Sequence, residues 1–156
     1  MSIIIERAKL VAKMVHLNEK RRNGEPYFNH CERVANTLSI VPNQKEFVIC
    51  GGYLHDVFEN AKNPKTIRHL VFDYFPREVY HLVEILTHDK NIDYNRYIEL
   101  VCYNPYAFEI KIADMFDNTE DVNLPDKQKA KYRGACLLMI SKDKIVPQIL
   151  KDRLNL

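Results

Sequence analysis

Two polar residues, His55 and Asp56, interrupt an otherwise apolar stretch that we expect to form one buried helix over about residues 44–60. An ionised carboxylate buried without a partner costs on the order of several kcal/mol, so the charge of Asp56 must be compensated. A divalent cation would compensate it directly, and imidazole and carboxylate groups are both good metal ligands. A lone His-Asp pair is more often a buried aspartate that binds an arginine than a metal site.

Three other residues favour the metal hypothesis over the ion pair. Glu59 follows His55 by four positions, which places both on one face of the expected helix. His30 lies on the preceding expected helix, on a face that is otherwise apolar. The segment "IKIADMFDN" places Asp114 inside another largely apolar helix, with Asn118 one turn later. These segments supply further ligands and a further carboxylate for the same centre.

We therefore predict a site for one divalent metal, formed by four side chains: His30, His55, Asp56 and Asp114. Two imidazoles and two carboxylates suit manganese, iron or magnesium better than a structural zinc site, which favours thiolates. The donor set leaves Mn²⁺, Fe²⁺ and Mg²⁺ open, with Zn²⁺ as a further alternative. Such a centre can activate a bound water, and Glu59 places a further carboxylate beside it.

The elements that position these residues are all expected to be helices, because alternating strand patterns are nearly absent. Asn63-Pro64 and Asn104-Pro105 each place an N-cap residue before a proline at the first helical position. The expected helices cover about residues 3–16, 28–40, 44–60, 64–74, 76–87, 94–103, 105–118 and 126–141, with a short one ending near residue 154. The prediction is an all-α fold of eight or nine helices in a single domain over residues 1–156, with its motifs between about 16 and 118.

Bulk composition excludes several classes of protein. The net charge of +2 gives no reason to expect nucleic acid as a partner, and no apolar run is long enough to span a membrane. Without an export signal, a cytoplasmic location is expected. The four widely spaced cysteines are expected to be reduced core residues: Cys31, Cys50, Cys102 and Cys136. The expected partner is a small-molecule nucleotide, and no feature of the sequence sets the oligomeric state.

Four segments carry a resemblance to a known family. "RRNGEPYFNHCERVA", "GGYLHDVFEN", "YNRYIELVCYNP" and "IKIADMFDN" resemble, in order and spacing, the hydrolase domain of the RelA/SpoT family and especially its small alarmone hydrolases. That family belongs to the HD superfamily of metal-dependent phosphohydrolases, whose signature is H…HD…D. The resemblance implies an HD-domain helical bundle that uses manganese and removes the 3′ pyrophosphate of guanosine tetra- or pentaphosphate.

The resemblance also implies roles for individual residues. The four predicted ligands take the places of the family's metal ligands, and Glu59 takes the place of its catalytic glutamate. Arg21 falls where the family has an arginine against the guanine base. Tyr94 and Asn118 fall near its nucleotide-contacting positions.

Two lysines are further candidates for binding phosphate, on their chemistry alone. Lys20 belongs to a short basic cluster for which composition favours a solvated loop, and Lys111 precedes Asp114 by three residues on the same helix. A lysine extending along the surface is the alternative for Lys111. For Tyr94, simple packing is the alternative to contact with a base.

Two departures from the family pattern concern the substrate. The family has a Glu-Asp pair where this chain has Glu59-Asn60, and a glutamine in "HxGQ" where this chain has Glu19 in "HLNE". Asn60 cannot act as a general base, but it could donate a hydrogen bond to a phosphate oxygen or hold a water at the catalytic site. Three other hypotheses therefore stay open: a phosphohydrolase for another nucleotide, a nucleotide-sensing module with reduced turnover, and a helical interaction domain.

Overall fold

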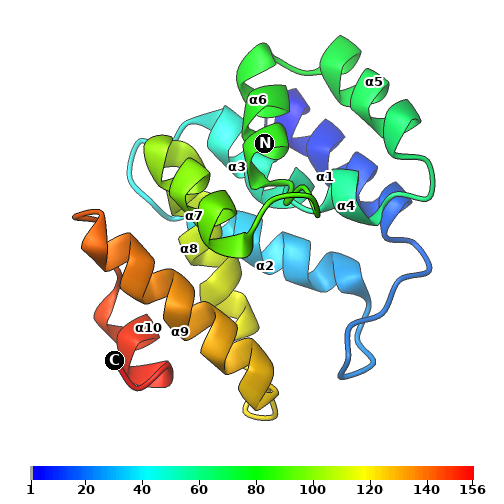
Figure 1. Ribbon diagram of the computed structural model, residues 1–156. Helices are drawn as coiled ribbons and strands as arrows, with labels where there is room; N and C mark the ends of the chain where they lie inside the picture. Colours follow the sequence, from blue (N-terminus) through cyan, green and yellow to red (C-terminus); the bar gives the residue numbers. More distant parts are fainter. Residues whose placement is uncertain (1) are drawn as a thin grey trace. The chain divides into compact units, whose positions relative to one another are not determined.

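The computed structural model describes residues 2–156, and every regular element within them is a helix (Figure 1). The all-α prediction is confirmed, and the expected helix over residues 44–60 is the one that is divided, into α3 and α4. The described residues form ten helical segments, or nine helices if α3 and α4 are counted as one interrupted helix. The helices are α1 (Ile3–Val15), α2 (Tyr27–Ser39), α3 (Glu46–Leu54), α4 (Val57–Asn60), α5 (Pro64–Tyr74), α6 (Arg77–Leu86), α7 (Tyr94–Tyr103), α8 (Pro105–Asn118), α9 (Asp126–Ser141) and α10 (Gln148–Arg153).

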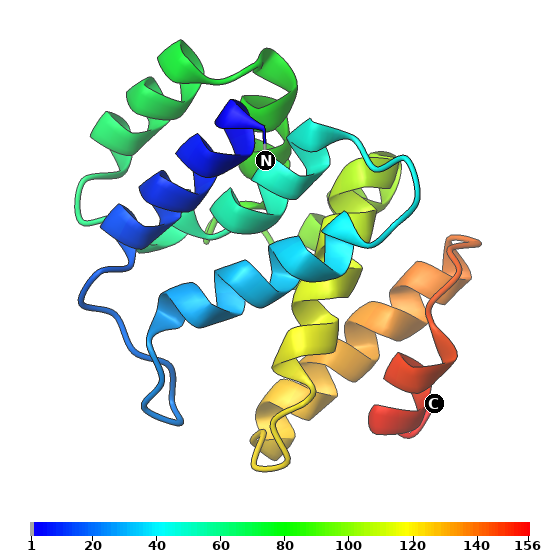
Figure 2. The same ribbon diagram turned by 180° about the vertical axis from the view of Figure 1, so that it is seen from behind.

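The helices group into two compact units, Met1–Thr87 and His88–Leu156. In the first unit α3 is the central helix, because it packs against α1, α2 and α6, while α4 packs against α5 (Figure 2). The sequence explains this position, since α3 is apolar around most of its circumference and buries residues on all sides. The prediction of a single domain over residues 1–156 stays a prediction.

A glycine sets how closely α2 and α3 approach each other. A Cβ atom added to Gly52 would lie 2.7 Å from Leu38 Cδ1 and 3.0 Å from the Cα of Ala35, closer than atoms pack. Both contacts are on α2, so the absence of a side chain at Gly52 allows the two helices to touch. This contact brings the part of α2 that carries His30 beside the end of α3.

The second unit is built around α7, which packs against both α8 and α9. The predicted N-cap of α8 is confirmed, since the Asn104 side chain accepts hydrogen bonds from two backbone N–H groups of the first turn. The last helix is joined to α8 by Arg153, whose Nη1 donates to the Phe116 carbonyl at 2.8 Å. Asn63 caps α5 in the same way in the first unit, accepting from Thr66 N.

All four cysteines are buried and none is in a disulfide, which confirms the expectation of reduced core residues. Burial raises the pKa of the Cys50 thiol to about 12 and that of Cys136 to about 11, so both thiols stay protonated and act as small apolar side chains. Among the described residues, no helix is both long and apolar enough to cross a membrane.

Candidate metal centre and active site

The chain leaves helical geometry at the predicted ligand Asp56, directly after His55, which still has helical backbone angles. α3 ends at Leu54 and α4 begins at Val57, with Asp56 between them at φ −107° and ψ 0°. This bridge region of backbone conformation is sparsely occupied and is frequent at active sites. The expectation of one continuous helix is therefore wrong at this point, and Glu59 and His55 do not share one helix.

Three predicted ligands converge at this interruption. His30 Nε2 on α2 lies 3.2 Å from His55 Nε2, while Asp56 Oδ2 lies 2.9 Å from His55 Nε2 and 3.8 Å from His30 Nε2. The rings of His30 and His55 are almost completely buried, and the Asp56 side chain is 20% exposed. Ligand atoms bound about 2.1 Å from one ion, at adjacent positions, lie about 3 Å apart. The arrangement of these three atoms could hold a metal ion.

A backbone carbonyl fixes the proton of the His55 ring. His55 Nδ1 lies 2.8 Å from the oxygen of Gly52, and a carbonyl oxygen can only accept a hydrogen bond. Nδ1 therefore carries a proton, and Nε2 is the nitrogen that faces His30 and Asp56 and can bind a metal. An imidazole whose other nitrogen donates to a carbonyl is the usual arrangement for a metal-binding histidine.

Tyr27 is a residue of this centre that the sequence alone did not identify. Its hydroxyl donates a 2.6 Å hydrogen bond to Asp56 Oδ2, and its ring lies edge-on to His30. Tyr27 precedes His30 by three positions on α2, so the two share a helix face. This spacing in "YFNH" was the signal that could have identified it.

The two proposed catalytic residues lie on α4, directly after the interruption. Glu59 is exposed and lies in the first turn of this short helix. Asn60 donates from Nδ2 to Glu19 Oε1 at 2.8 Å. The second oxygen of Glu19 lies 2.7 Å from Nδ1 of the buried His16. The two residues that depart from the family pattern are thus hydrogen-bonded to each other.

The fourth predicted ligand, Asp114, lies in the second unit and is buried on α8. Its Oδ2 accepts from Lys111 Nζ at 2.8 Å, and its Oδ1 accepts from Asn118 Nδ2 at 2.7 Å. These residues lie three before and four after Asp114, so all three share one face of α8. The two oxygens of the carboxylate are thus oriented by neighbours on its own helix.

Lys111 differs from a lysine that extends along the surface. Its side chain is only 14% exposed, and its Nζ lies 5.6 Å from the centre of the Tyr97 ring. Burial disfavours the charged ammonium, but the Asp114 carboxylate, with smaller contributions from Tyr97 and Tyr94, raises the pKa of Lys111 well above its ordinary value. Lys111 therefore stays charged and compensates Asp114.

The basic cluster before α2 is ordered by a glutamate. Arg21 Nη1 donates to Glu25 Oε1 at 3.1 Å, and Arg33 on α2 donates to both Glu25 oxygens at 3.0 and 2.7 Å. The bidentate bond from Arg33, aided by Arg21, lowers the pKa of Glu25 to about 2. Arg21 thus has a fixed place, whereas Lys20 is exposed at an isolated bridge with Pro26.

Tyr94, at the start of α7, lies in an aromatic group of the second unit. Its ring is 5.7 Å from that of Tyr97 and 5.6 Å from that of His88, and Lys131 Nζ lies 4.5 Å from its centre. Tyr97 is buried in the core, while Tyr94 is half-buried. A role for Tyr94 in nucleotide binding stays a prediction.

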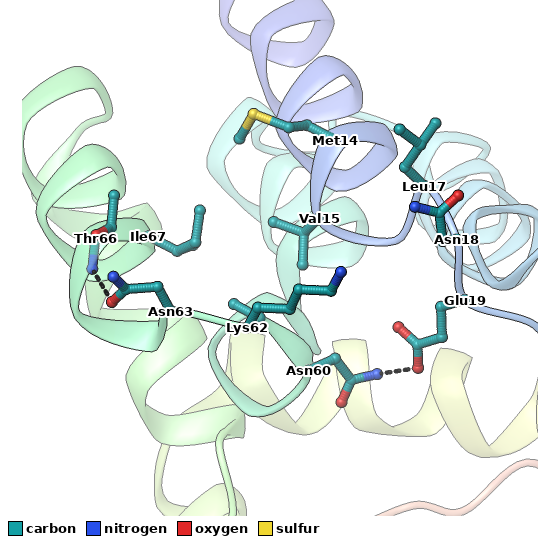
Figure 3. A pocket seen from close by; sticks show the side chains of 11 residues that line it. Met14, Val15, Leu17, Asn18, Glu19, Asn60, Lys62, Asn63, Thr66 and Ile67 are labelled. Atoms are coloured by element: carbon teal, nitrogen blue, oxygen red, sulfur yellow. Dashed lines mark hydrogen bonds between the residues drawn. The ribbon is translucent and has the colours of Figure 1, made fainter.

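A groove of about 560 Å³ lies in the first unit, between the end of α1 and the segment after α4 (Figure 3). Glu19 and Asn60 line it, joined by their hydrogen bond, and Asn63 lines its other side beside Thr66. The three convergent ligands are absent from its lining. The groove therefore adjoins the end of α4 without including the residues of the candidate metal centre.

Comparison with known proteins supports this interpretation of the motifs. A model of the HD domain matches residues 8–154. The chain is 29% identical over 143 residues to a probable guanosine-3′,5′-bis(diphosphate) 3′-pyrophosphohydrolase of Mycoplasma genitalium, covering 81% of this chain and 20% of the relative. It is also 29% identical over 135 residues to the guanosine-3′,5′-bis(diphosphate) 3′-pyrophosphohydrolase of Aquifex aeolicus, covering 81% of this chain and 19% of the relative. The chain thus spans about a fifth of the length of these relatives.

The fold is also that of a solved structure. The chain is similar, with a TM-score of 0.75 and 23% identity, to the structure of a metazoan ortholog of SpoT that is described as hydrolysing ppGpp and playing a role in starvation responses. The similarity covers 99% of this chain and 93% of the other. Because the HD-domain match extends over nearly the whole sequence, this chain belongs to the HD domain family.

Proposed function

We propose that this chain is a metal-dependent pyrophosphohydrolase that removes the 3′ pyrophosphate of guanosine 3′,5′-bis(diphosphate). The observation that carries the proposal is the convergence of His30, His55 and Asp56 at the interruption between α3 and α4. Two of the relatives in the comparison are named for this activity, and HD hydrolases depend on a metal.

We propose Mn²⁺ as the metal and Asp114 as the fourth ligand. The donor set fits a divalent cation, since two imidazole nitrogens and a carboxylate oxygen already lie at ligand spacing. Asp114 is supported by its place in the H…HD…D order and by a carboxylate that Lys111 and Asn118 hold in one orientation. A divalent cation held by these residues would lower the pKa of a bound water and would neutralise charge on phosphate oxygens.

The chain's own residues supply the rest of the chemistry. Glu59 accepts a proton from the attacking water, whose oxygen bonds to the phosphorus next to the 3′ oxygen. The bond from that phosphorus to the 3′ oxygen breaks, and the proton passes to the leaving oxygen. Arg21 contacts the guanine base, and Lys20 binds phosphate. Tyr94 and Asn118 are kept as proposed nucleotide contacts. We also propose a cytoplasmic location, where such nucleotides are found.

A screen of nucleotides with added Mn²⁺ tests this function. Release of pyrophosphate from guanosine 3′,5′-bis(diphosphate) is the expected result, and Asp56→Asn should abolish both Mn²⁺ binding and turnover. Asp143→Asn is the matched control, because this exposed aspartate has φ 59°, a conformation that asparagine adopts readily. Hydrolysis of a different nucleotide would keep the phosphohydrolase and replace the substrate. Mn²⁺-dependent nucleotide binding without turnover would mark a sensing module.

A further inference from the structure

Glu19 and Asn60 both line the groove and are joined by a hydrogen bond (Figure 3). Asn60 ends α4, and its backbone N–H donates to the carbonyl of Asp56 at 3.0 Å. Glu19 lies in the segment that follows α1, 41 residues earlier. The bond therefore fixes α4, which carries Glu59, to a distant part of the chain.

A second path leads from Glu19 to the metal centre. Its Oε2 accepts from His16 Nδ1 at 2.7 Å, and the His16 ring stacks on that of Tyr27 with centroids 4.7 Å apart. Tyr27 in turn donates to Asp56. Both oxygens of Glu19 thus act on residues that contact the centre, one through Asn60 and the other through His16.

We propose that Glu19 and Asn60 form one positioning unit for the metal centre, a hydrogen-bonded pair that works only while at least one of its two members is an amide. The proposal rests on the proposed function and adds to it the residues that orient Asp56 and α4. On this proposal Asn60 is not a damaged catalytic position. It is uncharged because it must donate a hydrogen bond to the carboxylate of Glu19.

Hydrogen-bond accounting gives the reason. A carboxylate has acceptors only, so Glu19 needs a donor at residue 60 and a proton on His16 Nδ1. An aspartate at residue 60 would bring a second carboxylate to within hydrogen-bonding distance of Glu19, where two negative charges repel. If glutamine also replaced Glu19, its amide would donate to the new carboxylate at residue 60 while its oxygen still accepted from His16.

The test is a double-mutant cycle of Glu19→Gln and Asn60→Asp, with Mn²⁺ affinity and kcat/KM measured at each corner. Asn60→Asp alone should lower both quantities about tenfold, and the double variant should return to within about threefold of the unsubstituted protein. Glu19→Gln alone should cost less than about threefold, because the Asn60 amide can turn and accept from the new amide. Asn63→Asp is the matched control: it makes the same chemical change in the same groove, at an N-cap where aspartate serves as well as asparagine.

Each outcome decides a separate question. A rise in activity for Asn60→Asp with Glu19 present, or a double variant as impaired as Asn60→Asp, would overturn the positioning unit. A cycle that shows coupling in melting temperature but none in Mn²⁺ affinity would reduce the pair to a structural contact and also overturn it. If no nucleotide is hydrolysed while Mn²⁺ affinity follows the predicted pattern, the proposed substrate fails and the positioning unit stands.

Discussion

The two aspartates of the metal motif are surrounded by different kinds of partner. Asp56 contacts the rings of His30 and His55, which are possible metal ligands, and the hydroxyl of Tyr27. Asp114 instead binds a lysine ammonium on its own helix. An aspartate paired with a lysine has its charge compensated within the protein, whereas an aspartate grouped with two imidazole nitrogens can bind a cation together with them. The motif therefore has one half in which the aspartate lies among possible metal ligands and another half in which it is paired with a lysine of its own helix.

The largest expected effect separates these halves in metal-free protein. Asp114→Asn should lower the free energy of unfolding by about 3–5 kcal/mol, because it leaves the buried ammonium of Lys111 without its carboxylate. Asp56→Asn should change it by less than about 1 kcal/mol, since the amide oxygen can still accept from Tyr27. Urea unfolding in the presence of a chelator measures both. Adding Lys111→Met to Asp114→Asn should recover part of the loss, and equal losses for the two aspartates would refute the contrast.

Tyr27→Phe tests whether the hydrogen bond from Tyr27 prepares Asp56 to bind the metal. The variant loses the 2.6 Å hydrogen bond that orients the carboxylate, so Mn²⁺ affinity should fall about 10–100-fold. Calorimetric titration with Mn²⁺ measures the loss, and Tyr103→Phe, at an exposed tyrosine of α7, is the control. Unchanged affinity in Tyr27→Phe would mean that the tyrosine only packs.

Gly52→Ala tests how the helix contact positions the ligands. The added methyl would press on Leu38 and Ala35, which should cost about 1–3 kcal/mol of unfolding free energy and weaken Mn²⁺ binding. Gly134→Ala is the matched control in α9, where a Cβ meets nothing within 4 Å and alanine should stabilise the helix by up to about 1 kcal/mol. If both variants behave alike, α2 and α3 are not held by this contact.

The smallest effect concerns the loop that carries Arg21. The pKa of Glu25 is about 2 in the folded protein and 4.5 ordinarily, so its ion pairs stabilise the fold above about pH 4.5 and are lost as the pH falls towards 2. Glu25→Gln should lower the melting temperature near neutral pH. The difference from the unsubstituted protein should shrink through that acid window. A difference that stays constant from pH 7 to pH 2 would show that Glu25 contributes through something other than its charge.

The sequence predicted the helices well because their signals are local. The Asn-Pro pairs before α5 and α8 identify the starts of both helices from adjacent residues alone, and the periodicity of α7 gives its two ends. The interruption at His55 and Asp56 could not be predicted in this way, because the apolar residues on its two sides continue one pattern. Packing of the whole first unit decides the backbone at that point.

Contacts between residues far apart in the sequence could not be predicted from the sequence. Glu19 and Asn60 were each recognised as departures, but their separation by 41 positions gave no sign that they are partners. Lys111 was recognised by its spacing from Asp114, yet spacing alone did not separate a surface lysine from one buried beside its carboxylate. Family resemblance supplied the roles of Arg21, Tyr94 and Asn118, which remain predictions.

The interruption of the helix has a consequence for protein design. In a regular α-helix, adjacent side chains point about 100° apart. A His-Asp dipeptide in a continuous designed helix would therefore direct its two metal-binding side chains away from each other. Here the two residues lie between α3 and α4, and their donor atoms are 2.9 Å apart. A designer who transfers this motif to another scaffold must therefore copy the interruption between the two helices as well as the two amino acids.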